Sequence, residues 1–224
     1  MEPAPAPVGR LEIVSDVICP WCWIGRAHLD RALAILAEDG MTFEIGWLPY
    51  QLNPDMPVEG VERAAYRAQK FGSVERGAEL DAQVADAGRV AGLAFRHDLM
   101  ARTPNTVEAH RLIRLAAPSG LQHALVGRLF RAYFQEGEDV GDTAVLERLA
   151  TEVGLPEEAI VAFTAGQAAR DEVMMESLGL SQAGINGVPS FLLDRHLLFS
   201  GAMPGQRMAD AFRQAVAILR DRAA

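Results

Sequence analysis

The sequence has very little cysteine: its 224 residues include only Cys19 and Cys22, in the run Cys19-Pro20-Trp21-Cys22. A disulfide between them would close the smallest practical loop. Because disulfide stabilisation grows with loop length, to about 3 kcal/mol for a loop of roughly 15 residues, this bridge would add little to stability. Structural zinc normally takes four Cys or His ligands, and the five histidines are scattered, so no metal site is expected. The cysteines therefore indicate thiol–disulfide chemistry.

The chain also lacks long apolar runs and clustered positive charge. No stretch approaches the roughly 18 apolar residues of a transmembrane helix. The net charge is −9 and there is no Lys/Arg-rich run, which argues against a nucleic-acid surface or a membrane anchor. Residues 1–7 lack the basic and apolar regions of a signal peptide and are expected to form a short flexible leader. We therefore expect a cytoplasmic location, where a disulfide is usually transient and catalytic.

The overall composition, 50% hydrophobic and 23% charged, is typical of a globular protein. The length allows one domain, or one domain with a large insertion. Residues 10–16 predict a first strand. A helix follows, with Pro20 in its first turn and Gly40 at its end. The alternation over residues 42–47 predicts a second strand.

The middle of the chain, from about residue 61 to 182, is predicted to be helical almost throughout. Repeated apolar stripes at helical spacing, such as the one that begins at Ala109, indicate packed helices rather than a ligand site. After Gly184 the pattern changes, and residues 190–193 and 196–199 predict two strands of a hairpin with Asp194-Arg195 between them. A last helix follows Gly201. The fold class is therefore α/β.

Four segments in order resemble the DsbA-like thioredoxin-fold proteins of the FrnE type. They are Asp16–Gly25, which contains both cysteines; Leu52-Asn53-Pro54-Asp55; Asn105-Thr106 with Ala109-His110-Arg111-Leu112; and Gly184–Ser190. The resemblance covers residues 11–212. It implies a thioredoxin fold interrupted by a large all-helical insertion, with residues 10–60 and 184–222 as the thioredoxin-like domain. Residues 61–183 would then be the helical insertion domain, lying across the active site. Met203 departs from the family, which often has Gln there.

The first motif position supplies the expected nucleophile. Cys19 should lie at a helix N-terminus, where unpaired backbone N–H groups and the positive end of the dipole favour a thiolate. Cys22 should be the resolving thiol that attacks the mixed disulfide. Pro20 and Trp21 are expected to tune the pair, with Trp21 either offering an apolar platform to a substrate or covering the helix end.

A second substrate-binding element is implied by the resemblance alone. Thioredoxin-fold proteins place a cis-proline opposite the two cysteines, which here would be Pro189. The backbone of the preceding residue, Val188, would then pair with a substrate strand. Nothing local to this dipeptide predicts a cis bond, since only about 5–6% of such bonds are cis.

Three further polar residues have two interpretations each. Asn53 is either an ordinary turn residue or, as in glutathione-using relatives, part of a glutathione site. Asp16 is expected to cap or to bond a loop, with a role in proton transfer as the alternative. His110 is expected to be a packed or capping histidine rather than a catalyst.

Three functions remain open. The leading one is a thiol–disulfide oxidoreductase acting on protein or small-molecule thiols, with no bound cofactor and with glutathione or another thiol as a possible co-substrate. The second is a glutathione-dependent isomerase or transferase of the 2-hydroxychromene-2-carboxylate isomerase type, whose members carry serine at the first motif position. The third is a peptide-binding, chaperone-like module without redox turnover.

Overall fold

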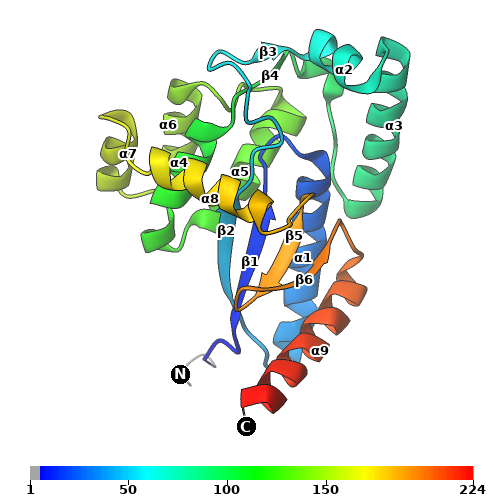
Figure 1. The fold of residues 1–224 in the computed structure, drawn as a ribbon, viewed down its shortest axis with the longest axis vertical. Helices are drawn as coiled ribbons and strands as arrows, with labels where there is room; N and C mark the ends of the chain where they lie inside the picture. The colour runs from blue at the N-terminus through cyan, green and yellow to red at the C-terminus, as the bar shows by residue number, and fades with distance from the viewer. Residues whose placement is uncertain (1–5, 224) are drawn as a thin grey trace.

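A four-stranded sheet forms the centre of the molecule (Figure 1). The computed structural model describes residues 6–223, so residues 1–5 of the expected leader lie outside the described part. The strands are β1 (Arg10–Ser15), β2 (Glu44–Pro49), β5 (Ser190–Leu193) and β6 (His196–Ser200), in the order β2-β1-β5-β6. Strand β1 pairs in parallel with β2 and antiparallel with β5, and β5 pairs antiparallel with β6. Strands from both ends of the chain thus meet in one sheet.

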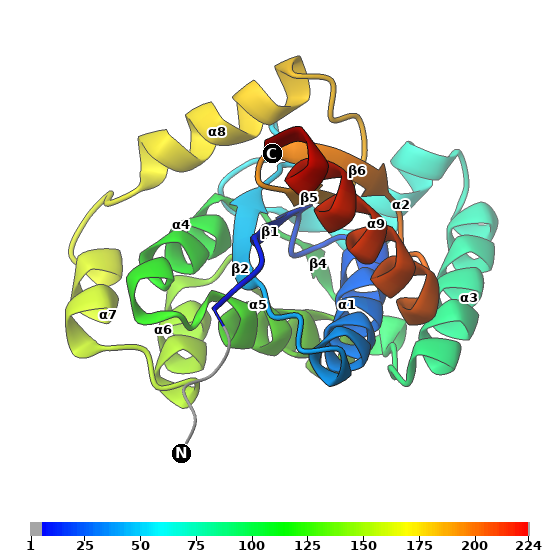
Figure 2. The same ribbon diagram turned by 90° about the horizontal axis from the view of Figure 1, so that it is seen from below.

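Helices cover both faces of this sheet. Helices α1 (Pro20–Glu38) and α9 (Gly205–Ala223) pack against each other on one face, and α8 (Arg170–Gln182) lies on the other (Figure 2). Buried side chains of β1 alternate accordingly: Leu11 and Ile13 join the main core, while Val14 joins a small cluster near α8 with Leu192. Cys19 and Cys22 follow directly from β1, so the central strand of the sheet positions them.

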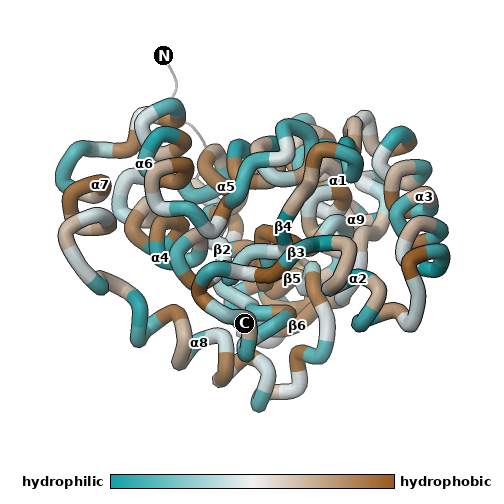
Figure 3. Tube along the Cα trace, turned by 90° about the horizontal axis from the view of Figure 1, so that it is seen from above, coloured by the Kyte–Doolittle hydropathy of each residue, from teal (hydrophilic) through white to brown (hydrophobic). Residues whose placement is uncertain are grey.

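The remaining helices come between β2 and α8 in the sequence. They are α2 (Arg63–Phe71), α3 (Val74–Ala91), α4 (Val107–Leu115), α5 (Gln122–Arg131), α6 (Thr143–Glu152) and α7 (Glu157–Thr164), with a π-helical turn over Ala132–Glu136 directly after α5. Helices α4 to α7 pack together beside β2, whereas α2 and α3 stand at the end of the sheet near the start of α1 (Figure 1). Figure 3 shows hydrophobic and hydrophilic residues alternating along α3, as expected of a helix with one exposed face. The α/β thioredoxin fold with a helical insertion is thereby confirmed.

The ends of the elements have simple causes. Pro20 is the first residue of α1, where its missing N–H has no intrahelical partner. Gly40 adopts φ 72° after α1 and donates its N–H to Ala37, while Met41 donates to Leu36, which together form a Schellman motif. The hairpin turn has positive φ at both Asp194 (47°) and Arg195 (67°), the geometry of a type I′ turn formed without glycine.

The expectation of helix almost throughout residues 61–182 was wrong at two short segments. Strands β3 (Val61–Glu62) and β4 (Arg102–Thr103) pair antiparallel with each other. Each is only two residues long, too short to give a period-2 pattern, and their pairing joins segments far apart in the chain. One 3-10 turn, His97–Leu99, precedes β4, and another, Ala117–Ser119, follows α4. Local sequence patterns carry no signal for such contacts.

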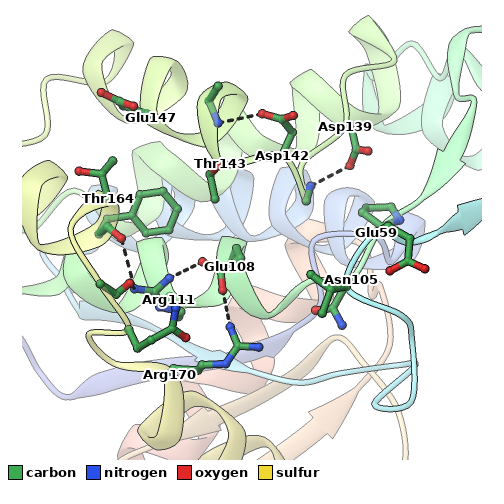
Figure 4. Close-up of a pocket in the computed structure, with 17 residues that line it drawn as sticks. Glu59, Asn105, Glu108, Arg111, Asp139, Asp142, Thr143, Glu147, Thr164 and Arg170 are labelled. Carbon is green, nitrogen blue, oxygen red and sulfur yellow. Dashed lines mark hydrogen bonds and ion pairs between the residues drawn. The ribbon is translucent and has the colours of Figure 1, made fainter.

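A cavity of about 900 Å³ lies among α4, α6, α7 and the start of α8 (Figure 4). Arg111 lies at its base and is 1% exposed. Its guanidinium donates to the carbonyl oxygens of Ala168 (2.8 Å), Gly166 (2.6 Å) and Phe163 (3.3 Å), and to the Glu108 carboxylate. Arg111 therefore holds the connection between α7 and α8, and its hydrogen-bonding groups are occupied within the protein.

Replacing Arg111 by methionine is expected to lower the free energy of unfolding by about 3 kcal/mol or more, because three carbonyl groups lose a buried donor and Glu108 loses a buried partner. Urea denaturation measures this. Arg170→Met is the matched control, since Arg170 also contacts Glu108 (2.6 Å) but its side chain is 30% exposed. The control should change stability by less than about 1 kcal/mol. Equal losses in the two variants would contradict this role of Arg111.

Candidate active site

Cys19 occupies the N-cap position of α1. Its backbone is extended (φ −86°, ψ 113°), and its carbonyl accepts the N–H of Cys22 at 3.0 Å. No side chain caps this helix end. Cys19 therefore stands at the N-terminus of α1, at the positive end of the helix dipole, where negative charge on a side chain is favoured.

Cys22 lies one turn further into α1 and is 1% exposed. Burial raises the pKa of the Cys22 thiol well above its ordinary value, and the hydrogen bond and charge of Cys19 raise this pKa further. The Ser15 hydroxyl and the Asp16 backbone oppose the shift without cancelling it. Both cysteines are free thiols in this structure. Cys22 is thus a protonated thiol held behind Cys19.

The loop before β5 faces this pair. The Val188–Pro189 bond is cis, as the resemblance implied, and the Cys19 thiol donates to the Val188 carbonyl oxygen across 3.5 Å. Gly25 of α1 packs against the proline ring, since a Cβ at Gly25 would lie 2.8 Å from Pro189 Cγ. The glycine therefore allows α1 to approach the proline loop closely.

A cleft of about 370 Å³ opens at Cys19, between the start of α1 and helices α2 and α3. Pro20, Trp21 and Val188 line it together with Cys19, so four of the seven expected site residues meet here. Pro189 lies in the loop that carries Val188, and Cys22 is buried behind Cys19. Neither residue lines the cleft itself. The Trp21 side chain is 44% exposed, which favours the platform interpretation over a cover for the helix end. Trp23 is instead buried, with its ring stacked on Phe134 at 5.6 Å.

The opposite wall of the cleft is basic. Arg63, Arg67 and Lys70 of α2 all line it, and Lys70 is the only lysine of the chain. Asp81 of α3 pairs with both Arg63 (2.8 Å) and Arg67 (2.7 Å). The single Asp81 carboxylate thus pairs with two guanidinium groups. Lys70 has no carboxylate partner among residues 6–223. This wall carries net positive charge in a protein whose overall charge is −9.

Asn53 lies at the rim of the same wall. Its side-chain oxygen accepts hydrogen bonds from the Tyr66 hydroxyl (2.8 Å) and from Lys70 Nζ (3.2 Å). Its side-chain nitrogen is buried and has no hydrogen-bonding partner within the described part of the chain. Asn53 therefore orients Lys70 and Tyr66, an arrangement that neither interpretation of the sequence anticipated.

Sequence reasoning missed the cations of α2, although a signal exists. Arg63, Arg67 and Lys70 are spaced i, i+4 and i+7, which places them on one face of a helix. The sequence could not tell that this face turns towards Cys19, because the approach of α2 to α1 is a tertiary contact.

Of the other polar residues, Asp16 bonds a loop as expected, accepting the N–H of Leu52 at 2.8 Å. His110 is buried, also as expected.

Between residues 6 and 223 no three His, Cys, Asp or Glu side chains come together as metal ligands could. Over the same residues, no helix has the length and hydrophobicity needed to cross a membrane.

Known proteins share this architecture. The structure of the probable DsbA oxidoreductase SCO1869 from Streptomyces coelicolor is similar with a TM-score of 0.80 and 32% identity, over 92% of this chain and 89% of that one. The cytosolic disulfide reductase DsbM from Pseudomonas aeruginosa, in a structure with GSH, gives 0.63 and 22%, over 96% and 98% of the two chains. A 2-hydroxychromene-2-carboxylate isomerase gives 0.64 and 15%, over 95% and 97%, a likeness of fold alone.

The family assignment follows from the whole chain rather than from the two cysteines. The model of the DSBA-like thioredoxin domain matches residues 10–217, which include every strand of the central sheet and the complete helical insertion. This chain belongs to the family of DSBA-like thioredoxin domain proteins.

Proposed function

We propose that this protein is a thiol–disulfide oxidoreductase of the FrnE type that works in the cytoplasm through Cys19 and Cys22. The observation that carries the proposal is the asymmetry of the two thiols. Cys19 lines the cleft at the N-terminus of α1, with its sulfur 3.5 Å from the Val188 carbonyl oxygen and 5% of the residue exposed, whereas Cys22 is 1% exposed and does not line the cleft. A nucleophile must be reached by the substrate, whereas a resolving thiol needs only to reach the nucleophile.

The exchange then has two steps. The Cys19 thiolate attacks one sulfur of a substrate disulfide, a Cys19–substrate bond forms, and the other substrate sulfur leaves as a thiolate. Cys22 next loses its proton and attacks Cys19, which forms the Cys19–Cys22 disulfide and releases the second substrate sulfur. The substrate is reduced by two electrons and the protein is oxidised by two. The reverse sequence oxidises a dithiol.

The two sides of the cleft serve substrate binding in this proposal. Trp21 offers an apolar surface beside Cys19, and the backbone at Val188 lies where an extended substrate segment would pass. Pro20 and Pro189 hold the two chain segments that carry these groups. A peptide or a peptide-like thiol fits such a site better than a compact apolar molecule.

The basic wall favours a small thiol with carboxylates, such as glutathione, as co-substrate. Lys70, held by Asn53 and Tyr66, is free to pair with a ligand carboxylate, and Arg63 and Arg67 add positive charge beside it. The DsbM structure contains GSH, which supports the same class of ligand. DsbM is described as a cytosolic disulfide reductase, in line with the location proposed here.

Replacing Lys70 by glutamine is expected to raise the KM for glutathione disulfide about three- to fivefold with little change in kcat, because an exposed ion pair contributes up to about 1 kcal/mol to binding. Steady-state reduction kinetics at low ionic strength measure this. Arg76→Gln is the matched control. It removes one positive charge from an exposed arginine of α3, whose side chain pairs with Glu79 (2.7 Å). Equal kinetics in the Lys70 variant and wild type would contradict a carboxylate site at Lys70.

A direct test of the proposed function is the reduction of insulin disulfides with glutathione as electron donor. Turnover above the uncatalysed rate supports an oxidoreductase. Binding of insulin chains without turnover would indicate the chaperone-like alternative. Glutathione-dependent conversion of a chromene carboxylate, without insulin reduction, would indicate the isomerase alternative.

A further inference from the structure

A further cavity lies at the end of the sheet opposite the cysteines. It measures about 550 Å³ and opens where β1 begins and the β5–β6 hairpin turns, whereas Cys19 follows the other end of β1 (Figure 1). On the same face of the sheet, Leu180 of α8 packs against Val14 and Leu192. The cavity is thus a part of this face that α8 leaves uncovered. Six of its seven lining residues are charged, three arginines and three acids.

Glu12 has a carboxylate oxygen without a partner in this cavity. Glu12 belongs to β1, lines the cavity and is 5% exposed. Its Oε1 lies 3.7 Å from Arg10 Nε, and its Oε2 is buried with no hydrogen-bonding partner within residues 6–223. Burying a carboxylate oxygen without a donor costs free energy. An ammonium group of a ligand in the cavity would supply the missing donor.

Arg10 lies beside Glu12 but does not satisfy this oxygen. Its Nη1 donates to Glu44 at 3.0 Å. Its guanidinium lies over Gly46, the residue that pairs with Glu12 across the sheet, since a Cβ at Gly46 would lie 3.0 Å from Arg10 Nη2. A carboxylate and a guanidinium therefore stand close together in the cavity wall. They suit a ligand whose own ammonium and carboxylate are attached to one carbon atom.

Arg195 adds a cation that has no acidic partner. It stands in the hairpin turn at φ 67°, is exposed, and forms no ion pair or hydrogen bond within the described part of the chain. The remaining charges of the cavity are occupied, because Arg114 pairs with Glu176 and the Asp194 carboxylate accepts the N–H of Arg10 at 2.9 Å. One buried carboxylate oxygen and one guanidinium are thus left for a ligand.

We propose that this cavity binds the zwitterionic head of an α-amino acid. The ligand ammonium donates to Glu12 Oε2 and the ligand carboxylate accepts from Arg195, with Arg10 adding positive charge beside it. An amine or a carboxylate alone would satisfy one of these two groups and leave the other without a partner. Free amino acids and γ-glutamyl peptides both carry this head. The inference goes beyond the proposed function and does not depend on it, because the site lies away from Cys19.

Calorimetric titration of the full-length protein with L-alanine tests this site. Saturable binding at one site per chain is expected, with a Kd on the order of 1 mM because the ligand is small and Arg195 is exposed. Ethylamine and propionate each carry one of the two charges and should bind about tenfold more weakly or worse. γ-Glutamylglycine distinguishes the two sources: it should bind more tightly than L-alanine if the site takes γ-glutamyl peptides, and more weakly if it takes free amino acids.

Two variants assign the binding to the named groups. Glu12→Gln keeps the size of the side chain and removes its charge, whereas Arg195→Asn removes the guanidinium and tolerates the positive φ. Each should weaken the binding of L-alanine about tenfold or more. Arg207→Asn is the matched control, since Arg207 is an exposed arginine of α9 that does not line the cavity. This control should bind L-alanine as wild type does.

The contrary results are equally specific. No saturable binding of L-alanine or γ-glutamylglycine to the wild-type protein up to about 50 mM would overturn the site, and so would equal affinity in Arg195→Asn and wild type. Propionate that binds as tightly as L-alanine would indicate a simple anion site and would also overturn it. If Glu12→Gln does not fold, Arg195→Asn decides, because this turn position is exposed. Insulin reduction by Arg195→Asn should equal that of wild type, so failure of this site leaves the proposed function intact.

Discussion

Replacing Cys19 by serine is expected to reduce thiol–disulfide exchange by about a thousandfold or more, to the uncatalysed background, as the loss of a covalent nucleophile does in other enzymes. A serine hydroxyl stays protonated at the helix N-terminus, so it cannot attack a disulfide at neutral pH. Insulin reduction with glutathione as electron donor measures the loss. The fold should be unaffected, because sulfur is exchanged for a slightly smaller oxygen in a buried position.

The same variant separates the competing functions. The isomerases that share this fold carry serine at the first motif position, so an isomerase of that type would keep or gain glutathione-dependent activity in Cys19→Ser. A chaperone-like module would bind unfolded chains equally well with either residue. Exchange at the wild-type rate in Cys19→Ser would contradict the assignment of Cys19 as the nucleophile.

Replacing Cys22 by serine is expected to trap the protein as a stable mixed disulfide at Cys19. The first attack remains possible because Cys19 keeps its place at the start of α1, but nothing then displaces the substrate sulfur. Incubation with glutathione disulfide should yield one glutathione adduct per chain, detected by intact mass and assigned to Cys19 by peptide mapping.

The double variant with serine at both positions provides the control and should form no adduct. Dithiothreitol should release the adduct from Cys22→Ser and restore its original mass. An adduct of Cys22→Ser that disappears as fast as the wild-type intermediate would show that another group resolves it, and the role assigned to Cys22 would be wrong.

Much of the central fold follows from local patterns in the sequence. Strand β1, Pro20 at the start of α1 and Gly40 after its end each depend on neighbouring residues only, so their signals are complete within a short window. The hairpin was also predicted, although Asp194 and Arg195 adopt positive φ without a glycine. The pairing of β3 with β4 was missed, because two residues are too few to carry a pattern.

The residues of the candidate site also differ in whether the sequence alone could reveal them. Cys19 and Cys22 could be found because their spacing is itself the chemical signal. The cis bond at Pro189 could be expected only from the resemblance to a family. Lys70 required the tertiary structure, since what matters is that α2 faces α1 across the cleft.

The polar groups near Cys22 were the least predictable part of the site. Asp16 and His110 could each be singled out in the sequence, but nothing there placed them next to each other. The contact between Asp16 and His110 arises because the insertion brings α4 against the end of β1, where a buried histidine meets a buried carboxylate. Contacts of this kind depend on the packing of distant segments and leave no periodic signal in the chain.

The most direct test of the central claim is redox equilibration of the wild-type protein over a series of ratios of reduced to oxidised glutathione, followed by acid quenching and intact-mass measurement. The account predicts that the chain loses two hydrogen atoms as the mixture becomes oxidising, with peptide mapping assigning the bond to Cys19 and Cys22. A two-electron equilibrium should describe the transition. A protein that remains a dithiol at every ratio, or that only accumulates glutathione adducts without forming this bond, would contradict it.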